Sequence, residues 1–195
     1  MSKKVLIIFG HHNYKPGTSF NAACRDVFTE ECNKLGHEVD LINIYEDKQL
    51  KFFDGSKPDQ QILDYQRRLE NCDTFMVMSP CHNYIMNAAT ENFIANVFTP
   101  GFSFNYKRLL NFNWGYPVPY KLKGKTAIIF YSYGGPNFFY SFVLQQIPRR
   151  VKSSVFKGLA GCKIKFVRFY EVLPEMKKEV FEKHMKKMRQ VAHNL

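Results

Sequence analysis

Residues 10–24, with the sequence GHHNYKPGTSFNAAC, follow directly after the apolar run Val5, Leu6, Ile7, Ile8 and Phe9. An unbroken apolar run of this length is typical of a parallel strand that is covered on both faces. The glycines, proline, histidines and hydroxyl residues that follow predict a loop, and the apolar spacing from residue 20 onward predicts a helix. The segment therefore predicts strand, loop and helix, the first unit of a parallel α/β sheet.

Strands and helices are expected to alternate along the rest of the chain. Apolar and alternating residues predict further strands over residues 38–44, 74–79, 125–131 and 163–170. Helical apolar spacing lies between these strands and after the last one. Right-handed crossovers place such helices on both faces, so the predicted fold is a flavodoxin-like, doubly wound five-stranded parallel sheet of order 2-1-3-4-5.

Glycine and proline mark the expected ends of several helices. Gly36 is expected to end the first helix, and Pro148 to mark a break or kink in a helix that runs from about residue 139 through the 140s. Pro174 is expected to open the last helix. The predicted inward face of that helix carries Val180, Phe181, His184, Met188 and Val191.

The composition, 45% hydrophobic and 23% charged over 195 residues, suits one globular domain over residues 1–195. No apolar run approaches the ~20 residues of a membrane span, and Lys3 and Lys4 lead into a strand rather than into a signal peptide. We therefore expect a cytoplasmic protein without a membrane span. The five cysteines form no C-x-x-C pair, which favours reduced core thiols over disulfides or a zinc site.

The formal net charge of +11 could attract nucleic acid, an anionic membrane surface or phosphorylated small molecules. Much of the basic excess lies in the last third of the chain, where lysines are interleaved with Glu175, Glu179 and Glu182 at helical spacing. Such interleaving is typical of a solvated helix face. We therefore expect no specific nucleic-acid partner, and a basic nucleic-acid-binding surface remains the alternative.

The expected site of chemistry is the edge of the sheet at which the parallel strands end. In doubly wound sheets, ligands bind outside the carboxyl ends of the strands, at the switch point between strands one and three. The candidate functional loops are therefore those after Phe9, Ser79 and Tyr131.

The first of these loops has the composition of an anion-binding turn. Unpaired N–H groups and the positive dipole end at a helix start can hold a phosphate, with the hydroxyls of Thr18 and Ser19 as further donors. Phe20 and Asn21 complete this helix start, and His11 could add a donor. An ordinary N-cap that binds no ligand would explain the same residues. No metal site is expected at the adjacent histidine pair, because no carboxylate or cysteine ligand accompanies it.

The second and third loops are rich in amide, aromatic and glycine residues. Residues 80–88 read PCHNYIMNA, and residues 132–137 read SYGGPN. Such loops suit a planar heteroaromatic ligand that lies on backbone and is hydrogen-bonded at its edges. A glycine pair alone is equally consistent with a simple turn.

Three signatures together resemble the flavodoxin-like NAD(P)H:quinone oxidoreductases, or NAD(P)H-dependent flavin oxidoreductases. They are His11 followed by residues 19–21, the segment 80–104 with FIANVF and PGFSF in its second half, and Gly134-Gly135 after strand four. The resemblance covers nearly the whole chain. It implies a flavoenzyme that passes hydride from NAD(P)H through bound FMN, with FAD as the alternative flavin, to a quinone or similar small electrophile.

The resemblance also implies where the flavin lies. The first loop is expected to bind its phosphate, the second to pass along the isoalloxazine edge, and the glycine pair to lie near the pyrimidine side of the ring. No metal ligand is expected. The expected cofactor-binding residues are His11, Thr18, Ser19, Phe20, Asn21, Pro80, Cys81, His82, Asn83, Tyr84, Ser132, Tyr133, Gly134 and Gly135.

Four positions depart from the pattern of the resembled family. Asn83, Ile85 and Asn87 stand where that family usually has tryptophan, glycine and proline. Tyr140 matches a tyrosine near the hydride acceptor of mammalian-type members and is the expected catalytic residue, although packing at an interface would explain it equally. Gln146 replaces a histidine and cannot relay a proton. These departures favour an alternative, a flavodoxin-like binding module or regulatory subunit with little or no reductase activity.

Residues 99–124 form a long connection that is rich in aromatic residues. Connections longer than ~12–15 residues usually cover a site or an interface. In the resembled family this region helps to build a homodimer with active sites between subunits, so we expect a homodimer. An aromatic flap packed on its own sheet is the alternative. The aromatic residues are Phe102, Phe104, Tyr106, Phe112, Trp114, Tyr116 and Tyr120.

Overall fold

The computed structural model of the chain describes residues 2–48, 50–109, 115–143 and 146–195. Within these ranges, five parallel strands lie in the order β2-β1-β3-β7-β8, and the short strand β4 (Ile85–Met86) pairs antiparallel with β3. The predicted flavodoxin-like order is therefore confirmed. The parallel strands are β1 (Lys4–Phe9), β2 (Glu38–Asn43), β3 (Thr74–His82), β7 (Thr126–Ser132) and β8 (Lys163–Phe169).

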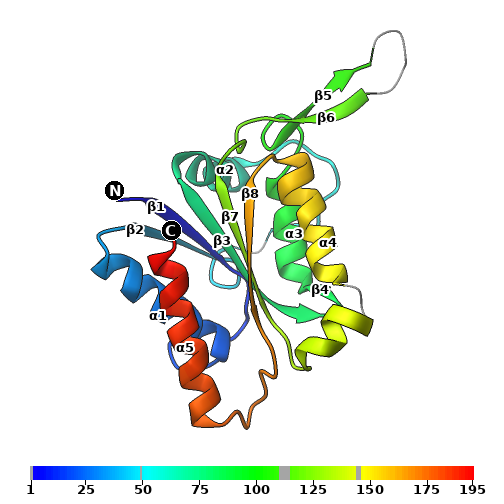
Figure 1. Cartoon of the computed structure of the whole chain (residues 1–195). Helices are drawn as coiled ribbons and strands as arrows, with labels where there is room; N and C mark the ends of the chain where they lie inside the picture. Colours follow the sequence, from blue (N-terminus) through cyan, green and yellow to red (C-terminus); the bar gives the residue numbers. More distant parts are fainter. Residues whose placement is uncertain (1, 49, 110–114, 144–145) are drawn as a thin grey trace.

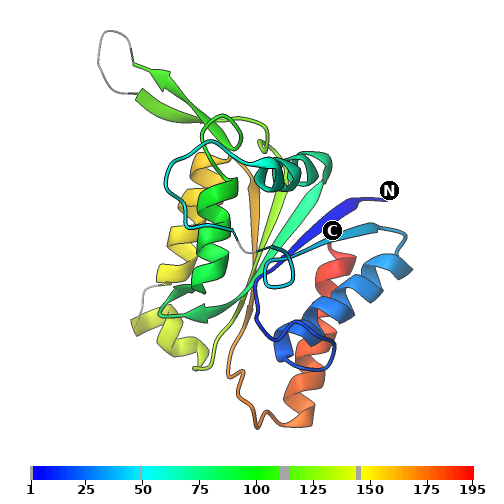
Figure 2. The ribbon, with the colours of Figure 1, turned by 180° about the vertical axis from the view of Figure 1, so that it is seen from behind.

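Helices cover both faces of this sheet (Figure 1, Figure 2). On one face α1 (Phe20–Lys34) and α5 (Lys178–His193) lie side by side. The other face carries α2 (Gln60–Asn71), α3 (Ala88–Val97) and α4 (Ile147–Ser153), and the π-helical turns η1 (Phe139–Val143) and η2 (Ser154–Leu159) flank α4 in sequence. None of the helices in the described part of the chain combines the length and the apolar character that crossing a membrane requires.

The central strands are apolar because each supplies side chains to both layers. Along β1, Leu6 and Ile8 enter the core shared with α2 and α3, whereas Val5, Ile7 and Phe9 enter the core shared with α1 and α5. All five side chains are buried, which explains the continuous apolar run of this strand. The cysteines are free thiols, and four of the five are buried.

Several predicted boundaries differ from the structure. Strand β3 continues past Ser79 to His82, because its end pairs with β4 in a hairpin. Pro148 lies in the first turn of α4, just after the start of that helix, where its missing N–H costs no helical hydrogen bond. The last helix begins at Lys178, and Pro174 belongs to the segment before it.

The last helix turns its predicted apolar face toward the sheet. Met185, Met188 and Ala192 are buried, and the other residues that were expected to face inward are half-buried. The lysines and glutamates between them are exposed, as expected of a solvated face.

Part of the long aromatic connection forms the antiparallel strands β5 (Phe104–Arg108) and β6 (Gly115–Pro119). This ribbon projects away from the main sheet instead of folding onto it (Figure 1). Phe112 and Trp114 lie outside the described residues. Of the other aromatic residues, Phe102 and Phe104 are buried, and Tyr106, Tyr116 and Tyr120 are exposed.

Gly10, the residue directly after β1, lies against the start of α3. A Cβ atom at this position would be 1.9 Å from Oγ1 of Thr90. Thr90 is fully buried, and its hydroxyl donates a hydrogen bond to Oδ1 of Asn87 (2.9 Å). The Gly10 N–H also donates to the carbonyl oxygen of Met78 in β3 (2.8 Å). A residue without a side chain is therefore required where β1 approaches α3.

We expect Gly10→Ala to lower the free energy of unfolding by roughly 1–3 kcal/mol, because the added methyl group overpacks a site with a fully buried neighbour. Denaturant unfolding followed by circular dichroism measures this difference. Gly158→Ala is the matched control, since the nearest atom to its added Cβ would be the Ser153 carbonyl oxygen at 4.0 Å. Unchanged stability of Gly10→Ala would contradict the close approach to α3.

Candidate functional site

One cavity of about 830 Å³ is bordered by the ends of β1, β3 and β7 and by the segment after β8. This is the carboxyl edge of the sheet, where doubly wound folds bind ligands. The three predicted loops therefore meet at one place. The predicted cofactor-binding residues that line it are His11, Thr18, Ser19, Phe20, Asn21, Pro80, Cys81, His82, Ser132, Tyr133 and Gly134.

The other predicted site residues lie outside the described lining of this cavity. Asn83 and Tyr84 form the turn between β3 and β4. A Cβ atom at Gly135 would be 3.2 Å from the ring of Tyr140, and that ring packs against the ring of Tyr133 with centroids 4.3 Å apart. Burial raises the pKa of the Tyr140 hydroxyl. Tyr140 thus lies behind a residue of the cavity wall, and its catalytic role stays a prediction.

Sequence reasoning missed the segment between β8 and α5. The carboxyl end of β8 lies at the same edge as that of β7, so the rule that selected the first three loops applies to this segment as well. Residues 12, 13, 17 and 23 of the first loop and helix were also missed. The additional lining residues are His12, Asn13, Gly17, Ala23, Val172, Leu173, Pro174, Met176, Lys178 and Phe181.

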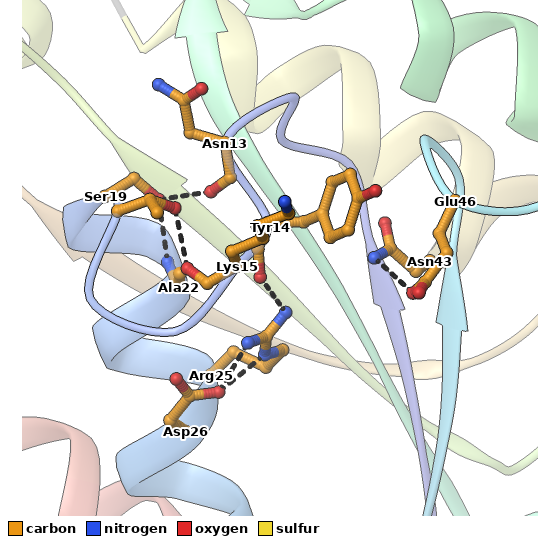
Figure 3. A network of polar contacts seen from close by, with 10 residues as sticks. Asn13, Tyr14, Lys15, Ser19, Ala22, Arg25, Asp26, Asn43 and Glu46 are labelled. Carbon is orange, nitrogen blue, oxygen red and sulfur yellow. Dashed lines mark hydrogen bonds and ion pairs between the residues drawn. The ribbon is translucent and has the colours of Figure 1, made fainter.

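The first loop is tied to α1 by hydrogen bonds (Figure 3). Ser19 is the N-cap of α1: its Oγ accepts the N–H of Ala22 (3.1 Å) and donates to the carbonyl oxygen of Asn13 (2.8 Å). Arg25, one helical turn further on, donates to the carbonyl oxygen of Tyr14 (2.8 Å). These contacts fix the path of the loop into the helix.

The charge of Arg25 is balanced within the fold. Its side chain is buried, pairs with the Asp26 carboxylate (2.6 Å) and lies over the Phe9 ring, 4.7 Å from the ring centroid. A guanidinium satisfied in this way supports the loop, and it is not a free cation for a ligand.

The predicted hydroxyl donors of the first loop turn toward the loop itself. Oγ1 of Thr18 donates to the carbonyl oxygen of Lys15 (2.6 Å), and the Ser19 hydroxyl donates to a loop carbonyl as described above. The backbone N–H groups of Ser19, Phe20 and Asn21, in contrast, have no acceptor within the described part of the chain. The donors available to an anion are therefore the N–H groups at the start of the helix.

Asn21 adds a buried side-chain donor to these N–H groups. Its side chain is 2% exposed and lines the cavity, and its Nδ2 has no hydrogen-bond partner among the described residues. A buried polar group without a partner typically costs about 1–3 kcal/mol. An acceptor bound in the cavity, such as a phosphate oxygen, would remove this cost.

His11 is a neutral donor at the same site. Its Nδ1 accepts the N–H of Asn13 (3.1 Å), which places the ring proton on Nε2. Burial and the neighbouring His12 and His82 lower the pKa of His11 to about 4. The rings of His11 and His12 stack with centroids 4.7 Å apart. His11 can therefore donate from Nε2 at neutral pH without carrying a charge.

The charge of the cavity wall favours an anionic ligand. Lys178 supplies a positive charge to the cavity wall, and no carboxylate occurs among its described lining residues. Within the described ranges, no group of three or more His, Cys, Asp or Glu residues could hold a metal ion. The arrangement therefore suits an organic anion.

Asn87, one of the departures from the expected pattern, joins the first and second loops. Its Oδ1 accepts the N–H of Thr90 (3.0 Å) and so caps α3, and its Nδ2 donates to the carbonyl oxygen of Gly10. Its own N–H donates to Oγ of Ser79 (3.2 Å). Proline could make none of these three hydrogen bonds.

The other departures also have a local explanation. Asn83 and Tyr84 have φ angles of 47° and 67°, which suit the two central residues of a type I′ hairpin turn. Ile85 then pairs with the last residue of β3. Gln146 precedes α4, and its Oε1 accepts a hydrogen bond from Arg149 (2.8 Å). It is not among the described residues that line the cavity.

Solved structures of similar fold align with nearly the whole chain. Smu.1420 from Streptococcus mutans UA159 is 24% identical with a TM-score of 0.81, over 98% of this chain and 100% of that chain. The NAD(P)H:quinone oxidoreductase from Methanothermobacter marburgensis is 16% identical with a TM-score of 0.80, over 100% and 97%. An FMN-dependent NADH-azoreductase from Bacillus anthracis, solved in complex with FMN, is 15% identical with a TM-score of 0.79, over 98% of each chain.

No curated protein matches the chain by sequence. A sequence profile of the family described as Flavodoxin-like fold matches residues 3–192. The match includes every strand of the main sheet, and the observed strand order agrees with that description. The chain therefore belongs to this flavodoxin-like family.

Proposed function

We propose that the chain binds FMN and transfers hydride from NAD(P)H to a quinone or similar small electrophile. The observation that carries this proposal is that Nδ2 of Asn21 and the N–H groups at the start of α1 have no hydrogen-bond partner among the described residues. These donors fit a flavin phosphate, and the described cavity wall presents no carboxylate to repel it. Flavoenzymes that use NADH or NAD(P)H are among the structures of similar fold, which supports the proposal.

The bound flavin would supply the hydride chemistry, and the protein would supply binding and orientation. The start of α1 and Asn21 would hold the phosphate, with Lys178 balancing its charge from the opposite segment. Cys81 and Tyr133 line the part of the cavity contributed by β3 and β7, where the isoalloxazine edge would lie. His11 would donate a hydrogen bond from Nε2 to the bound anion.

The binding-module alternative is favoured by the surroundings of Gln146. Mammalian-type members of the resembled family have a histidine at this position, whereas the Gln146 side chain accepts a hydrogen bond from Arg149 and lies outside the described cavity lining. A module of this kind could bind flavin and still fail to oxidise NAD(P)H.

We also propose that two copies of the chain associate through the β5–β6 ribbon. A two-stranded ribbon by itself is marginally stable in water. Tyr106 is 66% exposed on this ribbon, and Tyr116 and Val118 are exposed as well. A second copy would cover these side chains. The cytoplasmic location and the single domain over residues 1–195 stay predictions from the sequence.

Titration of the purified protein with FMN is expected to give a complex with a dissociation constant in the micromolar range or below. NADH or NADPH should then bleach the visible flavin band, and a small quinone such as menadione should restore it. Flavin binding without NAD(P)H oxidation would favour the binding module. A chain that binds neither FMN nor FAD at micromolar concentration would overturn the proposal.

Replacing both Thr18 and Ser19 by Asp separates a phosphate site from a simple helix cap. Asp also caps helices, but its carboxylate cannot donate to the carbonyl oxygens of Lys15 and Asn13, so the unfolding temperature without flavin should fall slightly. FMN affinity should fall at least tenfold, since the new charges oppose an anion whose hydrogen bonds contribute about 1.5–3 kcal/mol each. Riboflavin, which has no phosphate, is the control ligand and should respond far less. Equal FMN binding by variant and parent would leave only the capping role.

Asn21→Leu tests the role of the buried amide, because the substitution should maintain or raise the stability of the chain and lower its affinity for FMN. Leucine has a similar volume and needs no hydrogen bond, so the variant without flavin should be as stable as the parent or more stable. Its FMN dissociation constant should rise roughly tenfold, because the phosphate loses a donor to a charged group. Calorimetric unfolding and FMN titration measure the two effects. A destabilised variant with unchanged FMN affinity would assign Asn21 to the fold.

A further inference from the structure

Lys152 on α4 is 1% exposed although it carries an ammonium group. Its Nζ lies 2.5 Å from Oε2 of Glu91 on α3. The other carboxylate oxygen, Oε1, accepts the backbone N–H of Met86 in β4 (3.0 Å). One carboxylate thus connects α4, α3 and the β3–β4 hairpin.

Stability is a weak explanation for this ion pair. Burial lowers the pKa of Lys152, and the neighbouring Glu91 carboxylate opposes that shift. The cost of removing two charges from water often cancels their attraction, so an apolar pair of similar shape is commonly as stable. The role of the pair is therefore better explained by the positions of the elements that it connects than by a gain in stability.

The fixed geometry is that of a cavity wall. Met86 lies opposite Cys81 in the β3–β4 hairpin, and Ile85 lies opposite His82. Cys81 and His82 line the candidate flavin cavity, whereas Glu91 and Lys152 are not among its described lining residues. A displacement of Met86 would therefore be passed to the wall through the hairpin pairing.

We propose that Glu91 and Lys152 are positioning residues that hold the β3–β4 hairpin, and with it Cys81 and His82, in the conformation that binds the flavin ring. This inference rests on the proposed function. The pair acts through the Met86 N–H and does not touch the flavin itself.

The double variant Glu91→Gln/Lys152→Met tests the role of the pair. Glutamine and methionine fill the space of the two side chains, so thermal unfolding should stay near that of the parent. Without the ammonium group of Lys152, the side chain at position 91 is no longer held in place to accept the Met86 N–H. The FMN dissociation constant should rise about tenfold, since losing one contact between the wall and the flavin weakens binding by this order. The visible band and the reduction potential of the bound flavin should shift as well.

Asp40→Asn/Arg68→Met is the matched control. Arg68 on α2 forms two hydrogen bonds with the Asp40 carboxylate of β2 (2.6 and 2.8 Å), and both residues line a different cavity, with Lys4 at the start of β1. Loss of the Asp40–Arg68 ion pair should leave the FMN affinity, the visible band and the reduction potential of the bound flavin unchanged. The comparison separates an effect of removing any ion pair from an effect on the cavity wall.

Hydrogen exchange without flavin makes the test independent of the proposed function. The Met86 amide and its neighbours in residues 81–86 should exchange faster in the double variant of the pair and at the parent rate in the control. If the parent binds no flavin, the proposed function fails, and exchange still decides whether the pair holds the hairpin. Unchanged exchange and flavin affinity in the folded double variant would overturn the inference. So would a large loss of stability, because the pair would then be a structural support.

Discussion

Hydrogen bonds of the Gly10 backbone join the end of β1 to β3 and to the start of α3. The rest of the site depends on this junction. The Gly10 N–H donates to Met78 of β3, and its carbonyl oxygen accepts from Asn87, the N-cap of α3. The first and second loops therefore start from a common point. Because this spacing is set by backbone groups that are buried and paired, it does not depend on exposed side chains.

On this frame, the start of α1 is arranged before any ligand binds. Ser19 and Arg25 hold the loop through carbonyl oxygens, and the N–H groups left over are those that point out of the helix start. An anion bound there would meet donors that need no rearrangement, which lowers the entropy lost on binding. Nδ2 of Asn21, which has no partner among the described residues, is the opposite case, because an unpaired buried donor destabilises the chain without a ligand.

The fold was predictable because its signals are local and repeated. The apolar run of residues 5–9 and the helical spacing after Phe20 each select one element, and right-handed crossovers leave few ways to order the strands. The three predicted loops met at one cavity for the same reason. The fourth segment, which includes Val172 and Leu173, was missed because it has no glycine or hydroxyl signature of its own. The direction of the Thr18 hydroxyl was not predictable either, since a carbonyl three residues earlier competes with any ligand for it.

Departures from a family pattern are informative only together with the partner that each residue contacts. Asn87 replaces a proline, yet it gains a cap on α3 and a bond to Gly10, so the second loop is tied more firmly to the first than proline would allow. Gln146 stands where mammalian-type members of the resembled family have a histidine, and its side chain accepts a hydrogen bond from Arg149 outside the described cavity lining, so it cannot relay a proton there. The change at Asn87 preserves the connection between the first two loops of the site. The change at Gln146 would alter the chemistry that could follow ligand binding. The proposed flavin binding would therefore depend on the frame around Gly10, whereas the proposed turnover would depend on groups that this frame does not hold.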